Sequence, residues 1–214
     1  MALSALGGPI IAPTMLVALI IFISSLVPSA LEGEAPSGSV AFDGTIATGE
    51  YVHHASFSGG QFELHWLVEG QEVRFGMVGR TSGYVAIGFE PAVLMEDADM
   101  VIGWVDGTGA AQVHDLFCTG TFGPIHLDTD LGGTDDLLEF GAGTGDGTTT
   151  VEFRRALATG DAYDHDIPSE GRLKVIWATG SVFDPAVMPD RGAWGSSIWT
   201  PVGHRRTIGP GSCT

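Results

Sequence analysis

Three aspartates lie close together around one short apolar stretch of the sequence. Asp97 and Asp99 precede the apolar residues Met-Val-Ile-Gly-Trp-Val, and Asp106 follows them. Carboxylate oxygens are the ligands that calcium, a hard cation, prefers in proteins. The spacing differs from that of an EF-hand loop. These three residues are therefore candidate ligands of a structural cation.

Asp99 has an alternative role, because a carboxylate beside an apolar strand can also accept hydrogen bonds from backbone or arginine donors. Arg154 and Arg155 are the expected partners. A further acidic region extends from Leu127 to Gly147. We interpret it as a long solvated loop, with metal binding as the alternative.

The chain contains two cysteines, Cys118 and Cys213. Neither belongs to a Cys-x-x-Cys pair or a Cys/His cluster, which disfavours a thiolate zinc site. In an exported protein the two thiols can form one disulfide. We predict this Cys118–Cys213 bond, which would attach the C-terminal tail to the domain.

No motif of an enzyme that acts alone occurs in the sequence. The Gly-x-Ser-x-Gly and His-Glu-x-x-His patterns are both missing. The glycine-rich stretch from Gly141 to Asp146 precedes an expected strand, so no helix N-terminus follows it to bind phosphate. We expect no catalytic residues. Trp194, among glycines, is the tryptophan best suited to stack on a sugar ring.

The elements that must position these residues are strands. Phe62, Leu64 and Trp66 alternate with polar residues, as do the apolar residues after Gly70, which is typical of a hairpin. Similar short runs separated by turn residues predict a β-sandwich or barrel. The expected strands are 62–66, 73–77, Tyr84–Phe89, Met100–Val105, Ala111–Leu116, Thr148–Phe153, Leu173–Ala178 and Ser197–Val202.

The N-terminal segment has a different character. Residues 1–31 carry no charged side chain and include a long apolar run, which predicts one hydrophobic helix serving as a signal peptide or membrane anchor. We expect a flexible linker at 32–50, the sandwich at 51–203 and a C-terminal tail at 204–214. The chain is therefore expected outside the cytoplasm, secreted or anchored at the outer face of the membrane.

The composition excludes one class of partner. The formal net charge is −17, from 26 acidic and 9 basic residues. Such a surface repels phosphate backbones and anionic lipid headgroups. We therefore expect no nucleic-acid partner, and membrane contact only through the N-terminal segment if that segment is retained.

Four segments, in order, resemble the DOMON family. They are Gly83–Phe89, the stretch Met95–Asp106 with Ala-Asp before an apolar strand and a tryptophan, the stretch Thr149–Leu157 with Val-x-Phe-x-Arg, and Ile176-Trp-Ala-Thr-Gly180. The resemblance covers about Phe57 to Trp199. It implies an all-β, immunoglobulin-like sandwich outside the cytoplasm. Family members carry haem b, bind sugars or other small ligands, or accompany redox domains.

The resemblance also supplies a candidate haem ligand. Met95 stands at the place of the family's axial methionine, whereas the region after Gly180 lacks the axial histidine. Met188 and Lys174 are substitutes for the second ligand, and His204 lies beyond the matching place. Met95 is also a suitable core residue.

The sequence thus leaves two functions open. The first is a non-catalytic module, without a cofactor, that binds a carbohydrate, another small molecule or a redox partner protein. The second is a haem b electron carrier that uses Met95 as an axial ligand. The missing histidine favours the first.

Overall fold

The computed structural model describes residues 41–181 and 193–199. The expected N-terminal helix, Met188, His204 and Cys213 all lie outside the described residues. Within the described part, no helix has the length and apolar character needed to cross a bilayer.

The described chain is built almost entirely of antiparallel strands. Its elements are β1 His53–Phe57, β2 Phe62–Glu69, β3 Glu72–Gly79, β4 Tyr84–Phe89, β5 Asp99–Val105, β6 Ala111–Cys118, β7 Ile125–Leu127, α1 Asp128–Leu131, β8 Glu139–Gly145, β9 Thr148–Ala156, β10 Leu173–Gly180 and β11 Ala193–Trp199. The all-β class and the sandwich expected from the alternating pattern are confirmed.

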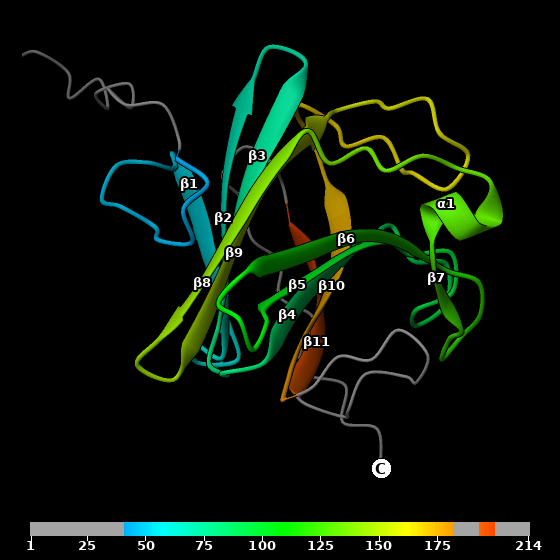
Figure 1. Cartoon of the computed structure of the whole chain (residues 1–214). Coiled ribbons are helices and arrows are strands. Elements are labelled where there is room, and N and C mark those ends of the chain that lie inside the picture. Colours follow the sequence, from blue (N-terminus) through cyan, green and yellow to red (C-terminus); the bar gives the residue numbers. More distant parts are fainter. Residues whose placement is uncertain (1–40, 182–192, 200–214) are drawn as a thin grey trace, which may run out of the picture. The chain divides into compact units, whose positions relative to one another are not determined.

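Two sheets form the sandwich (Figure 1). The first sheet has five strands in the order β1-β2-β3-β9-β8, and the second has six in the order β11-β10-β4-β5-β6-β7. Side chains of both sheets meet in one apolar core between them. Phe62 of the first sheet stacks on Trp177 of the second, with ring centroids 5.2 Å apart.

The core follows from the period of two along each strand. Leu64, Phe75 and Phe153 of the five-stranded sheet point inward, and Ile87 and Val101 of the other sheet meet them. Phe75 is completely buried, and its ring lies 5.2 Å from Phe153 and 5.4 Å from Phe89. Large aromatic rings at the sheet interface therefore supply much of the buried apolar area.

The expected long loop at Leu127–Gly147 is wrong in part, because it contains α1 and β8. Strand β8 escaped prediction since glycine alternates with larger residues along it. Gly141 and Gly143 have a packing role: a Cβ at these positions would lie 1.9 Å from the carbonyl oxygen of Phe42 and 2.6 Å from that of Gly44. Glycine thus allows another backbone segment to lie against the strand.

That other segment belongs to the expected linker. Residues 41–50 lie against the five-stranded sheet and are attached through Glu152 of β9. The backbone N–H groups of Gly44 and Thr45 donate to Glu152 Oε2 at 2.9 and 3.2 Å, and the Tyr51 hydroxyl donates to Oε1 at 2.9 Å. The packed domain therefore includes residues before 51.

The interior position of Phe75 gives a stability prediction. The Phe75→Ala variant is expected to lower the free energy of unfolding by about 3–5 kcal/mol, because it leaves a cavity where three aromatic rings meet. Urea unfolding would measure this change. Phe140→Ala is the matched control, since Phe140 is 42% exposed and its truncation should change stability little. Equal losses in the two variants would contradict the assigned core.

Candidate functional site

Four aspartates meet at one end of the space between the sheets. Asp99 begins β5 and Asp115 lies in β6, each two residues from a valine of the core, so both point inward. Asp164 comes from the segment between β9 and β10, and Asp128 is the first residue of α1. Two strands and two connecting segments therefore supply the cluster.

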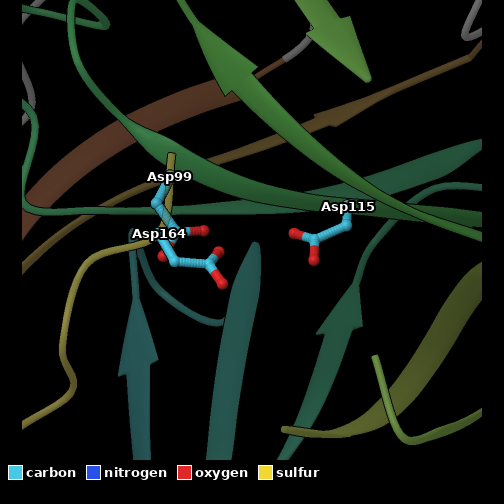
Figure 2. Close-up of side chains that lie close together, drawn as sticks. All are labelled: Asp99, Asp115 and Asp164. Carbon is cyan, nitrogen blue, oxygen red and sulfur yellow. The ribbon is translucent and has the colours of Figure 1, made fainter. Parts of the chain in front are cut away.

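The carboxyl groups are close enough to share one cation. Asp99, Asp115 and Asp164 each offer a carboxylate oxygen, and these atoms lie within 4.8 Å of one another. Figure 2 shows the carboxyl groups of Asp99 and Asp164 side by side, with Asp115 on the neighbouring strand. These side chains are shielded from water: Asp99 is 0% exposed, Asp115 4% and Asp128 1%, and the side chain of Asp164 is 1% exposed.

One positive side chain faces this cluster. Arg155 of β9 is completely buried, and its Nη1 donates to Asp99 Oδ2 at 2.7 Å. Its Nη2 lies 3.3 Å from Asp164 Oδ1. Burial lowers the pKa of Arg155, but the charges of Asp99 and Asp164 more than offset this and raise it. The expected partnership of Asp99 with Arg154 or Arg155 is confirmed for Arg155.

Backbone N–H groups donate hydrogen bonds to only some of the carboxylate oxygens of the cluster. The backbone N–H of His165 donates to Asp99 Oδ2 and that of Asp136 donates to Asp115 Oδ2, both at 2.9 Å. Asp99 Oδ1, Asp115 Oδ1 and both oxygens of Asp128 have no hydrogen-bond partner among the described residues. A buried polar atom without a partner is costly, so these oxygens indicate a missing ligand or bound protons.

The pKa values report the same imbalance. Burial raises the pKa of Asp115 to about 8, with a further increase from Asp164 and Asp99. Burial likewise raises the pKa of Asp128 to about 8, and the negative charge of Asp115 raises it further. For Asp164 burial outweighs the favourable charge of Arg155 and raises the pKa to about 6. The cluster can therefore hold protons near neutral pH or a hard cation in their place.

The other candidate cation ligands do not join this cluster. Asp97 precedes β5, where its backbone carbonyl lies 2.7 Å from His165 Nε2. Asp106 follows the far end of β5, and its Oδ1 accepts hydrogen bonds from the backbone N–H groups of Thr108 and Ala110. The bonds from Thr108 are the main reason that the pKa of Asp106 falls to about 2. Of the three sequence candidates, only Asp99 therefore lies in the carboxylate cluster.

Sequence reasoning missed Asp115, Asp128 and Asp164 as a group. The signal for Asp115 was an acidic residue at an inward position of an apolar strand, two residues after Val113. Asp128 belongs to the acidic region for which metal binding was the alternative. Asp164 carried no signal, because its place depends on how the segment between β9 and β10 folds.

A second apolar cluster covers the other face of the six-stranded sheet. Tyr84, Ala86, Met100, Ile102 and Leu116 alternate with core residues along β4, β5 and β6 and are buried on this outer face. At its margin further partly buried residues pack against it: Met95, Trp104, Ile125, Leu127, Ile176 and Ala178. Met95 therefore lies at the edge of an apolar sheet face.

The remaining candidates have separate places. Lys174 lies on the same face of β10 as Ile176, and its backbone N–H donates to Glu90 Oε1 at 2.6 Å. Trp194 lies in β11, opposite Ala178, instead of in the expected glycine-rich loop. Cys118 is a buried free thiol whose Sγ lies 3.1 Å from the Gly120 carbonyl oxygen, and its predicted partner Cys213 lies outside the described residues.

Comparison with known families decides the assignment. The sequence model of the DOMON domain matches residues 58–180. The chain belongs to the DOMON family. The matched residues run from the β1–β2 turn to the end of β10, so the match contains the carboxylate cluster and every described strand except the edge strands β1 and β11.

Curated relatives are longer proteins. The DOMON chain is 34% identical over 139 residues to human DBH-like monooxygenase protein 1, covering 63% of this chain and 22% of that protein. It is 30% identical over 136 residues to Protein Skeletor, isoforms B/C, of Drosophila melanogaster, covering 58% of this chain and 17% of that protein. The chain thus spans less than a quarter of the length of these relatives.

Solved structures with a similar fold include two cytochrome domains. One is the cytochrome b domain of pyranose dehydrogenase from Coprinopsis cinerea, with a TM-score of 0.49 and 17% identity, covering 69% of this chain and 80% of that chain. The other is the cytochrome domain of Myriococcum thermophilum cellobiose dehydrogenase, with a TM-score of 0.41 and 11% identity over 65% of this chain and 74% of that chain.

The raised pKa values predict how stability changes with pH in the presence of a chelator. An unfolded aspartate releases its proton near pH 4, whereas folded Asp115 and Asp128 release theirs at about 8. Between these values the unfolded state binds fewer protons, so stability falls as pH rises, by up to about 1.4 kcal/mol per pH unit for each group.

Urea unfolding in EDTA at pH 5 and pH 7.5 would measure this slope. Asp115→Asn should flatten it, because the amide has no proton to lose. A wild-type stability that rises over this interval, or an unchanged slope in the variant, would contradict the assignment of the buried carboxyl groups.

Proposed function

We propose that this DOMON chain is an extracytoplasmic, non-catalytic binding module of a redox system, and that it folds around a structural calcium ion. The apolar N-terminal segment supports the location, and the resemblance to DBH-like monooxygenase protein 1 supports the setting. The calcium ion would join β5, β6 and the segment that carries Asp164.

The observation that carries the calcium proposal is the set of buried carboxylates. When all four aspartates are ionised, they bring three negative charges in excess of that of Arg155. Uncompensated charge in the interior is costly. A calcium ion takes 6–8 oxygen ligands at about 2.3–2.6 Å, and carboxylate oxygens of Asp99, Asp115 and Asp164 that lack a hydrogen-bond partner are available for it.

Calcium should therefore raise the stability of the folded chain. At a concentration about 100-fold above its dissociation constant, calcium adds about 2.7 kcal/mol to the free energy of unfolding, because it binds only the folded state. Thermal unfolding of the full chain in EDTA and in millimolar calcium would measure the shift. Asp115→Asn should abolish most of it.

Asp146→Asn is the matched control for this experiment. Asp146 is exposed and has a positive φ of 51° in the β8–β9 turn, a conformation that asparagine also adopts. It should keep the full calcium response. A wild-type melting temperature that does not change when calcium is added would contradict the proposal.

The small ligand of the module would bind at a different place from calcium, on the outer face of the six-stranded sheet. The buried residues of this face are apolar apart from the Tyr84 hydroxyl, and Ala86 and Ala178 lie opposite each other near its centre. Small-molecule sites are lined mainly by apolar side chains, so this face suits an apolar molecule. Met95 at the edge would contact such a ligand.

Haem b is the specific ligand that the family relationship raises. Met95 fits one axial position, whereas the described residues offer no matching histidine. His114, the histidine on this face, packs on Trp104 with ring centroids 5.2 Å apart. Among the described residues, Met95 is therefore a candidate for one axial position, and the second position has no histidine candidate. A haem-free apolar ligand is the better supported alternative.

A hemin titration followed by visible spectroscopy separates these two ligands. A haem-free module should give no sharp Soret band, and Met95→Ala should then leave the spectrum unchanged. Met95→Asp should weaken binding of an apolar fluorescent dye at least about tenfold, because it places a charge at the edge of the apolar face.

Phe140→Asp is the control for the dye experiment, since Phe140 is an exposed aromatic residue of the opposite sheet. Equal dye binding by both variants would exclude this face as the binding site. A reduced wild-type spectrum with resolved α and β bands that Met95→Ala abolishes would replace the apolar ligand with haem.

A further inference from the structure

The edge of the five-stranded sheet carries a second group of side chains that are able to bind a metal ion. They belong to other strands than the carboxylate cluster. His54 of β1 pairs in register with His65 of β2, and Glu63 lies two residues before His65 on the same face. We propose that His54, His65 and Glu63 bind one divalent transition-metal ion of the zinc or copper class on the hairpin β1–β2.

The contacts place the three groups within reach of one another. The His54 and His65 rings are stacked, with centroids 5.8 Å apart and planes inclined by 22°. Glu63 Oε2 lies 3.7 Å from His65 Nε2. His54 is exposed, and the Glu63 side chain is 41% exposed. Rotation of these two side chains can therefore bring their ligand atoms onto a common ion, while water completes the coordination.

His65 is the fixed member of the group. Its side chain is 18% exposed, and the Tyr51 ring lies against it with centroids 6.0 Å apart. The Tyr51 hydroxyl is in turn held by Glu152 Oε1 at 2.9 Å. Tyr51 and Glu152 thus position one ligand before the ion arrives.

The donor set determines the class of ion. Two imidazole nitrogens and one carboxylate oxygen suit zinc, copper or nickel, with ligand distances near 2.0–2.1 Å for zinc. Calcium prefers an all-oxygen site and should go to the carboxylate cluster instead. The two proposed metal sites therefore differ in chemistry, and a measurement with excess calcium isolates the histidine site.

Isothermal titration of the full chain with zinc, in millimolar calcium at pH 7.5, tests the proposal. One zinc ion per chain is expected to bind. His54→Ala should weaken binding by more than about tenfold, because removal of a ligand costs at least as much as loss of a supporting contact. His54 is exposed, so this variant should keep the wild-type melting temperature in calcium.

His53→Ala is the matched control. His53 is the neighbouring residue of the same strand, but it points to the other face of the sheet and stacks on Trp66 at 5.3 Å. Its zinc affinity should equal that of the wild type. With copper, electron paramagnetic resonance should show coupling to two nitrogen nuclei, which His65→Asn reduces to one.

The experiment can refute the zinc site without refuting the calcium site. Absence of zinc binding, or equal affinity of His54→Ala and His53→Ala, would show that the stacked pair is not a ligand set. Asp115→Asn should bind zinc as the wild type does. Loss of zinc binding in Asp115→Asn but not in His54→Ala would assign zinc to the carboxylate cluster and refute the site on β1–β2.

Discussion

The buried ion pair between Arg155 and Asp99 connects the two sheets of the sandwich. Arg155 belongs to β9 of the five-stranded sheet and Asp99 to β5 of the six-stranded sheet, and neither is accessible to water. Buried ion pairs often add little net stability, since desolvation offsets the attraction. This pair carries a further cost, because Asp115, Asp128 and Asp164 bring additional negative charge into the same region. The end of the sandwich therefore depends on a counter-charge or on bound protons.

The alternation of side chains along β5 links this constraint to the candidate ligand face. Asp99 and Val101 point between the sheets, whereas Met100 and Ile102 point to the outer face. The segment before β5 carries Met95, and its Asp97 carbonyl contacts His165, whose backbone N–H donates to Asp99. The cluster and the Met95 segment therefore share one short stretch of chain.

Much of the fold could be predicted from sequence. Alternation of apolar residues predicted β2 and β3, and short apolar runs separated by turn residues predicted β4, β5, β6, β9 and β10. It missed β8, whose glycines serve the close approach of residues 42–44, and it missed the short edge strands β1 and β7. Strand β11 begins at Ala193, four residues before the predicted start.

The site was less accessible to sequence reasoning. The pairing of Asp99 with Arg155 could be predicted, since charged residues inside apolar strands are almost never buried without a partner of opposite charge. Asp128 and Asp164 come from connecting segments whose path no local pattern fixes. The pairing of His54 with His65 required the register of a hairpin, and a shift by one residue would have placed the two rings on opposite faces.

The calcium content of the purified full chain tests the central claim most directly. The protein would be purified from calcium-containing medium, freed of loosely bound ions by passage over a weak chelating resin, and analysed for metal and protein. One calcium ion per chain, lost when Asp115 and Asp164 are both replaced by asparagine, is the predicted result. A folded wild-type chain that holds no calcium at pH 8 would show that bound protons alone balance the cluster, and would contradict the account.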